Sequence, residues 1–149
     1  MKIGDVMSTN SVRILEGASF EEAAARVSDT GASDLMVVRS DGTFVGVLSE
    51  GDLIRATLPE YDDLMRDGAP VGGAWKVFLE KGREKRGTSI AEITITSPVT
   101  FRSTEDLIKA ASTMINKQIR ILPVVDDGKL VGTISRGDLC KAVLRGEGG

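Results

Sequence analysis

The sequence predicts a mixed α/β fold (α+β in arrangement) made of two tandem β-α-β-β-α repeats that pack with pseudo-twofold symmetry. The first observation is a duplicated stretch, because GVLSEGDL at 46–53 returns as GTISRGDL at 132–139. The second is a constant register, since Val12 matches Val99 and Leu35 matches Leu122, each 87 positions later. The offset falls to 86 at the hairpin, where one turn is a residue shorter. Repeats of this size usually leave a face that only the other copy covers, which favours one pseudo-symmetric domain.

The elements of the first repeat follow from its apolar spacing. A lead-in at 3–7 precedes a short strand at 12–15. A helix follows, because Ser19 and Glu22 have the spacing of a capping box and the apolar residues after Ser19 share one helical face. This helix should end near Gly31. A buried strand at 35–38, a turn at 40–42, a return strand at 44–48 and a helix that starts at Ser49 and is stopped by Pro59 complete the repeat.

The same order of elements returns from Ile90 onward. We therefore place the first repeat at 1–58, the second at 90–146, a linker at 59–89 and a short tail at 147–149. The linker is acidic at first and then predicts a short basic amphipathic helix, because Trp75, Phe78 and Leu79 have helical spacing. We expect this helix to pack its only Trp onto the core, and we keep a phosphate-binding or partner-binding role as the alternative.

Composition excludes several classes of function. The 149 residues contain no His and a single Cys, Cys140, so the usual zinc and haem ligand sets are missing. A formal net charge of −3 argues against a general nucleic-acid binder. No stretch is long and apolar enough for a membrane span, and no apolar leader follows Met1, so we expect a cytoplasmic protein. Nucleophilic and general-base catalysis have few candidate residues, and we expect no enzyme activity.

The repeated motifs resemble the CBS domain, and their pairing resembles a Bateman module. The resemblance rests on IGDVMS at 3–8, ILPVVD at 121–126 and the Gly-x-x-Ser-x-Gly-Asp-Leu motif of both copies. It implies two α/β units packed through their sheets, dimerised again into a flat disc, with adenine nucleotides bound in clefts between the units. Such modules regulate other proteins and do not catalyse.

The motif itself is suited to a nucleotide. A helix N-terminus with a Ser hydroxyl suits a phosphate, which assigns this role to Ser49 and Ser135. One carboxylate can accept both ribose hydroxyls, which assigns that role to Asp52 and Asp138. The alternative is that each Asp only caps its helix. By the resemblance, adenine would be read by backbone groups of the turns before the first strands, with these residues in the predicted set: Asn10, Val12, Thr96, Ser97 and Val99.

The two predicted sites differ in charge. The second has Arg136 inside its motif and Arg120 and Ile121 at the start of its buried strand. The first has Glu50 in the motif, and Ser33 and Asp34 at the strand. Because an Arg attracts phosphate and an acid repels it, we expect the second site to bind more tightly. The alternative is that the two arginines are exposed and pair with nearby acids.

The resemblance, which the chemistry of the motif supports, implies a regulatory, energy-sensing protein that needs no cofactor and binds AMP, ADP or ATP as a regulatory ligand. We expect a homodimer, because the helices that end each repeat have more apolar surface than one partner covers. The apolar residues concerned are Leu53, Ile54 and Leu58 in the first repeat and Leu139, Ala142 and Val143 in the second. The regulated protein is unknown from sequence, and neither nucleic acid nor a membrane is expected as a partner. The alternative is a scaffold that dimerises and binds no ligand.

Overall fold

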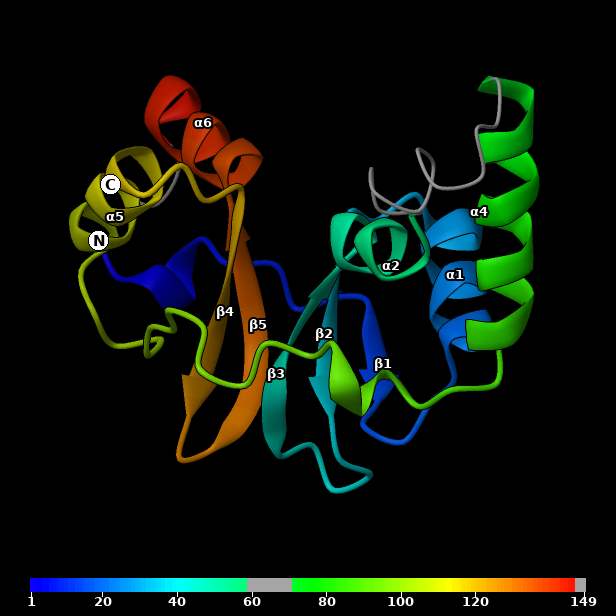
Figure 1. Cartoon of the computed structure of the whole chain (residues 1–149). Coiled ribbons are helices and arrows are strands. Elements are labelled where there is room, and N and C mark those ends of the chain that lie inside the picture. The colour runs from blue at the N-terminus through cyan, green and yellow to red at the C-terminus, as the bar shows by residue number, and fades with distance from the viewer. Residues whose placement is uncertain (59–70, 147–149) are drawn as a thin grey trace.

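The computed structural model describes residues 1–58 and 71–146, and it confirms the α+β fold with two repeats (Figure 1). Residues 59–70 of the predicted linker at 59–89 and the predicted tail at 147–149 lie outside the described residues. In chain order the elements are η1 (Ile3–Asp5), β1 (Arg13–Leu15), α1 (Phe20–Thr30), β2 (Asp34–Val38), β3 (Phe44–Ser49), α2 (Glu50–Thr57), α4 (Val71–Lys85), η2 (Ile90–Glu92), α5 (Leu107–Asn116), β4 (Ile121–Asp126), β5 (Lys129–Ser135) and α6 (Arg136–Arg145).

The first repeat forms a three-stranded sheet in the order β1-β2-β3. Strand β1 is parallel to β2, and β2 is antiparallel to β3. Helix α1 begins after Ser19, whose side chain accepts the Glu22 N–H at 3.1 Å, and it ends at Gly31, whose φ of 71° suits glycine. The predicted bounds of this helix are confirmed.

The second repeat has two named strands, β4 and β5, where a third was predicted around Val99. Of the residues around Val99, only Phe101 pairs with this sheet, through a bridge to Val124. In the first repeat, the Met36 N–H donates to the Val12 carbonyl at 2.9 Å. The matching residue in the second repeat is Pro123, which has no N–H to donate. The parallel ladder therefore loses one bond and shrinks to a bridge.

The predicted difference in hairpin length is also seen. Strands β2 and β3 are joined by residues 39–43, whereas β4 and β5 are joined by Asp127 and Gly128 alone. Both of these residues have positive φ, 50° and 79°. This is the backbone of the tightest hairpin turns, which favour Asp-Gly.

Each lead-in packs on the opposite repeat, which the sequence did not predict. Ile3 is fully buried in the core of the second repeat, and its N–H donates to the Glu105 carbonyl at 3.0 Å. Ile90 is fully buried in the core of the first repeat, and its N–H donates to the Ala18 carbonyl at 2.9 Å. This exchange ties the repeats into one unit.

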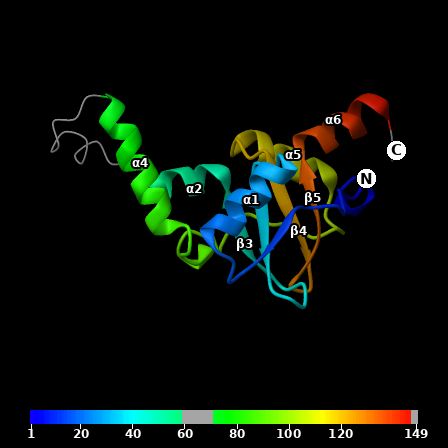
Figure 2. The ribbon, with the colours of Figure 1, turned by 90° about the vertical axis from the view of Figure 1, so that its right-hand side faces the viewer.

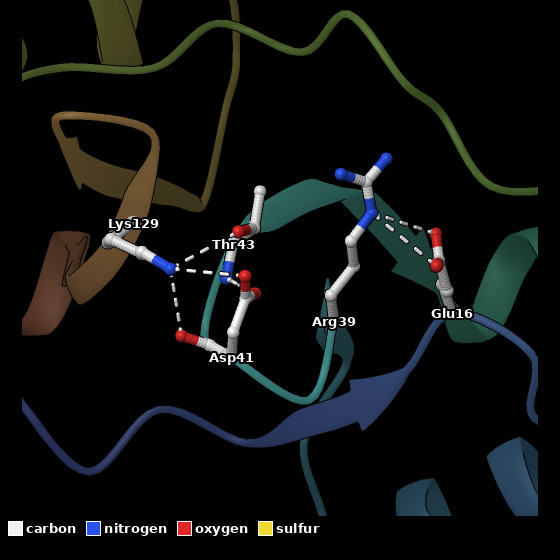
Figure 3. Close-up of polar contacts among 5 residues, drawn as sticks. All are labelled: Glu16, Arg39, Asp41, Thr43 and Lys129. Carbon is white, nitrogen blue, oxygen red and sulfur yellow. Dashed lines mark hydrogen bonds and ion pairs between the residues drawn. The ribbon is translucent and has the colours of Figure 1, made fainter.

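The two sheets also pack directly on each other. Met36 and Val38 from β2 form a buried cluster with Leu130 from β5. At the hairpin tips the Lys129 Nζ bonds to the Asp41 carbonyl at 3.0 Å and lies 3.3 Å from the Asp41 carboxylate (Figure 3). Figures 1 and 2 both place the hairpin tips at one end of the molecule and the starts of α2 and α6 at the other.

Helix α4 corrects one prediction about the linker. It lies beside α2 and projects from the body of the molecule (Figure 2). Trp75 stacks on Phe78, with ring centroids 5.6 Å apart, and remains 63% exposed. The prediction that Trp75 packs onto the core was wrong, because its ring packs on the next turn of its own helix instead.

Candidate functional site

Both predicted helix starts form complete capping boxes. The Ser49 hydroxyl accepts the Asp52 N–H at 3.1 Å, and the Asp52 carboxylate accepts the Ser49 N–H at 2.9 Å. Ser135 and Asp138 repeat this geometry with bonds of 3.1 and 2.9 Å. The capping interpretation therefore holds at both motifs. A binding role must use the carboxylate oxygen of each Asp that does not accept the Ser N–H.

The second carboxylate oxygen is available for a ligand at the second motif but not at the first. The other oxygen of Asp52 lies 2.6 Å from the Arg55 guanidinium, and the Ser49 hydroxyl donates to Asp52 at 2.9 Å. At Asp138, none of the described residues donates to the second carboxylate oxygen. This oxygen is an available acceptor for hydroxyl groups, whereas its counterpart on Asp52 already has a charged partner.

A cavity of about 370 Å³ lies between the repeats beside the second motif. Four segments line it: the loop before β1, the start of β2, the start of β4, and the end of β5 with the start of α6. The lining residues are Ser8, Asn10, Ser11, Val12, Ala32, Ser33, Asp34, Met36, Arg120, Ile121, Thr133, Ser135 and Asp138. Two of the four segments come from each repeat, so neither repeat forms the site alone.

Hydrogen bonds between the repeats build this arrangement. The Ser8 N–H donates to the Thr133 carbonyl at 2.8 Å, and the Thr133 N–H donates back to Ser8 at 2.9 Å. The Ser11 hydroxyl bonds to the Thr133 hydroxyl at 3.1 Å. A Cβ at Gly132 would lie 2.6 Å from the Ser8 carbonyl oxygen, which is closer than such atoms approach. The first Gly of the motif is therefore required by the close approach of the other repeat's lead-in.

The first motif is crossed in the same way. Val47 and Ile95 exchange backbone bonds of 3.0 and 2.9 Å, which brings the chain just before Thr96 alongside the strand that leads to Ser49. Each helix start is thus combined with the turn of the opposite repeat. The turn at 10–12 lines the same cavity as Asp138. The turn at 96–99 comes directly after Ile95, which pairs with Val47 in the strand before Asp52.

The structure brings together half of the predicted site residues. Those that line the cavity are Asn10, Val12, Arg120, Ile121, Ser135 and Asp138. The other predicted residues, which do not line it, are Arg136, Thr96, Ser97, Val99, Ser49 and Asp52. Arg136 turns back to the Ile119 carbonyl, to which its Nε donates at 3.0 Å. Val99 packs against the core of the second repeat.

The placement of Asp34 corrects the predicted division of charge. We assigned Ser33 and Asp34 to the first site, but both line the cavity that contains Asp138. The Ser33 hydroxyl donates to the Asp34 carboxylate at 2.8 Å. The cavity lining therefore carries two carboxylates, Asp34 and Asp138, and one cation, Arg120.

Sequence reasoning did not select the remaining lining residues, above all Ser8, Ala32, Met36 and Thr133. Thr133 lies in β5, just before the motif, whereas Ser8, Ala32 and Met36 come from the other repeat. The exchange of lead-ins and the packing of the two sheets bring these three beside Asp138, and no local pattern encodes either. The duplicated lead-in at 3–8 was the available signal, because a segment that recurs with each repeat needs a packing partner in both.

Two further searches concern the described residues only. None of the helices in 1–58 and 71–146 is long and apolar enough to cross a membrane. In the same part of the chain, no group of three or more His, Cys, Asp or Glu side chains is arranged to hold a metal ion.

Comparisons with known proteins point to one family. The sequence profile of the CBS domain matches residues 3–58 and 90–145. The chain is 29% identical over 154 residues to the chloroplastic CBS domain-containing protein CBSX2 of Arabidopsis thaliana, and the match covers 96% of this chain and 63% of the relative. A homoserine O-acetyltransferase of Methanohalobium evestigatum is 26% identical over 95% of this chain, which spans only 24% of that enzyme.

Solved structures agree with the sequence comparisons. The crystal structure of CBSX2 in complex with AMP superposes with a TM-score of 0.74 at 26% identity, covering 97% of this chain and 96% of the other. The cytosolic domain of the Mg²⁺ channel MgtE in complex with ATP superposes with a TM-score of 0.68 at 25% identity, covering 95% of this chain and 48% of the other.

Proposed function

Because the chain belongs to the CBS domain family and carries the domain as a tandem pair, we propose that it is a regulatory module that binds an adenine nucleotide in the cavity beside Asp138. The observation that carries this proposal is one carboxylate oxygen of Asp138 that accepts from none of the described residues and lies on the wall of a cavity shared by both repeats. The complexes of CBSX2 with AMP and of the MgtE domain with ATP support an adenosine ligand for a fold of this kind.

Each part of the nucleotide has a matching group in the cavity. The ribose hydroxyls donate to Asp138, while Ser135 and Arg120 offer donors to the phosphate. Adenine lies against the apolar side chains of Val12, Met36 and Ile121. The turn at 10–12 supplies backbone groups for its ring nitrogens.

Charge sets the expected preference among nucleotides. Arg120 is the single cation among the lining residues, and Asp34 opposes it. Each further phosphate adds negative charge near Asp34 without adding a cation. We therefore expect AMP to bind more tightly than ADP, and ADP more tightly than ATP.

Occupancy is transmitted because the ligand contacts both repeats at once. A nucleotide that bridges the turn at 10–12 and helix α6 stabilises one relative placement of the repeats over others. The regulated protein is a separate partner or a domain attached to the module. The homoserine O-acetyltransferase is an example of the second arrangement, because the match with this chain covers only 24% of that enzyme. The module itself regulates and does not catalyse, and we expect it to work in the cytoplasm.

We further propose that two copies associate through the helices. Ile54, Leu58 and Val143 are 51%, 49% and 74% exposed, so these predicted contact residues remain uncovered in the single chain. Leu53, Leu139 and Ala142, which we also predicted to contribute, pack within their own repeats. Beside Val143, an apolar groove of about 300 Å³ runs between α5 and α6. A second copy would cover these surfaces.

The test is calorimetric titration of the protein with AMP, ADP, ATP, S-adenosylmethionine and NAD. The proposal predicts saturable binding of AMP with one site per chain, and a weaker ATP complex. AMP should also raise the melting temperature. At an AMP concentration a hundred times the dissociation constant, the free energy of unfolding should increase by about 2.7 kcal/mol. If no adenine nucleotide binds at millimolar concentration, the ligand-free scaffold is the better account.

A further inference from the structure

A second cavity, of about 290 Å³, lies away from the nucleotide cavity and shares no lining residue with it. It is lined by the three residues of β1, by one side chain of α1, and by the end of β2 with its hairpin. The lining residues are Arg13, Ile14, Leu15, Arg26, Val38, Arg39, Ser40 and Gly42. We call it the arginine pocket, because it contains three arginines and no acidic residue.

The three guanidinium groups are held in place by different contacts. Nη2 of Arg13 donates to the Leu130 carbonyl at 3.2 Å, and Nη1 of Arg26 donates to the carbonyl of Arg13. Nε of Arg39 lies 3.4 Å from the Glu16 carboxylate, as Figure 3 shows. Contact with Glu16 uses only Nε, so the two terminal nitrogens of Arg39 keep their donors.

The charge of the arginine pocket is largely uncompensated. Within the described part of the chain, neither Arg13 nor Arg26 forms an ion pair, since each donates only to a neutral carbonyl. Arg39 is the one pocket arginine with a carboxylate partner. Two unbalanced positive charges match the two negative charges of a phosphate dianion, and guanidinium forks match its oxygens.

The fold alone does not explain the three arginines. The first and second repeats share one architecture, yet the matching positions 87 residues later are Thr100, Thr113 and Asp126. In the second repeat Asp126 instead accepts the Ser103 N–H at 3.0 Å. Each arginine makes one structural contact: Arg26 and Arg13 each donate to one backbone carbonyl, and Arg39 contacts Glu16. One carbonyl takes up at most one or two of the five N–H donors of a guanidinium, so these contacts leave donors over in the pocket.

From this geometry we infer that the arginine pocket is an accessory anion site that binds a phosphate or diphosphate group of a small molecule. Its volume of about 290 Å³ has room for a phosphate or a diphosphate, and its charge is what favours an anion. The Ser40 hydroxyl adds a neutral donor beside Arg39. This site is independent of nucleotide binding at Asp138.

The test titrates the full chain with pyrophosphate, and in a second arm with inorganic phosphate, at low ionic strength. Arg39→Gln and Arg26→Gln should each weaken pyrophosphate binding by about tenfold or more, because each removes a charged donor. Arg83→Gln, the same change on exposed helix α4, should leave the affinity within about twofold. Arg120→Gln removes the cation of the nucleotide cavity, so it detects pyrophosphate that binds there and not in the arginine pocket.

Several outcomes would overturn the assignment. They are absence of pyrophosphate binding to the unaltered protein, unchanged affinity in both pocket variants, and loss of binding in Arg120→Gln, which would move the anion to the nucleotide cavity. Arg26 holds a backbone carbonyl, so its variant is checked by its melting temperature. The side chain of Arg39 bonds to no backbone group among the described residues, and its variant carries the test if Arg26→Gln unfolds.

Discussion

Replacing Asp138 by Ala separates its two roles, because the structure assigns a different oxygen to each. One carboxylate oxygen accepts the Ser135 N–H at 2.9 Å and caps α6, and the other has no donor among the described residues. Asp138→Ala removes both. The lost cap lowers the free energy of unfolding by about 0.5–2 kcal/mol whether or not a nucleotide binds there. Stability alone therefore does not distinguish the roles.

Affinity for AMP does distinguish them. Two charge-assisted hydrogen bonds from the ribose are worth about 1.5–3 kcal/mol each, and about 1.4 kcal/mol corresponds to tenfold in affinity. We expect Asp138→Ala to weaken AMP binding by at least about tenfold in a calorimetric titration. Asp138→Asn is the matched control for the cap, since its carbonyl oxygen still accepts the Ser135 N–H while its amide offers donors where the ribose needs an acceptor.

Asp52→Ala is the matched change at the first motif. Arg55 already holds the second oxygen of Asp52, so we expect less than about threefold loss of AMP affinity at the tightest site. Equal losses from Asp52→Ala and Asp138→Ala would refute the ranking of the two motifs. Unchanged affinity in both, with folded proteins, would refute the ribose role altogether.

Three further predictions concern the fold and the assembly. Gly132→Ala should lower the unfolding free energy by about 1–3 kcal/mol, or roughly 2–12 °C in Tm, because its Cβ would meet the Ser8 carbonyl oxygen. Hydrogen bonds from the Thr43 side chain and backbone N–H lower the pKa of Asp41 to about 2. The stabilising contribution of this carboxylate is therefore present above about pH 4 and is lost as the pH falls towards 2. In denaturant titrations, Asp41→Asn should reduce this loss of stability at acid pH, which we call the acid limb. Val143→Asp should weaken self-association by about tenfold or more in sedimentation equilibrium, since it places a charge on the exposed apolar face.

Each of these predictions has a contrary result, and the first also has a matched control. Gly137→Ala should be neutral or stabilising, because the nearest atom to its added Cβ is the Ser135 Oγ at 3.6 Å; equal effects at Gly132 and Gly137 would contradict the close-approach argument. An acid limb that is identical in Asp41→Asn would show that this carboxylate is not linked to unfolding. A monomeric unaltered protein at micromolar concentration would contradict the proposed dimer, whatever Val143→Asp does.

Local features of the fold were predictable because nearby residues determine them. The boundaries of α1 follow from Ser19 and Gly31, and the capping boxes at Ser49 and Ser135 follow from a spacing of three residues. The shorter second hairpin could be read directly from the drop in the repeat offset at Asp127. In each of these cases the contacts that decide the structure lie within a few positions of one another.

The composition of the cavity was not predictable in the same way. Asp34 and Asp138 lie 104 positions apart, and only the packing of the two sheets and the exchange of lead-ins bring them to one cavity. Pro123 shortens the parallel ladder because it has no N–H to donate to the carbonyl of a distant strand. The sequence near Pro123 does not show that this hydrogen bond is expected there. Trp75 was misplaced because helical spacing identifies an apolar face without saying what covers it.

The central claim is that an adenine nucleotide occupies the cavity formed by both repeats beside Asp138. The most direct test is a two-dimensional ¹H–¹⁵N NMR titration of the labelled protein with AMP. We predict the largest shifts at the amides of Ser11, Thr133 and Asp138, which belong to different repeats but line one cavity. Shifts confined to the other motif, around Val47 and Asp52, or an unchanged spectrum at millimolar AMP, would contradict the claim.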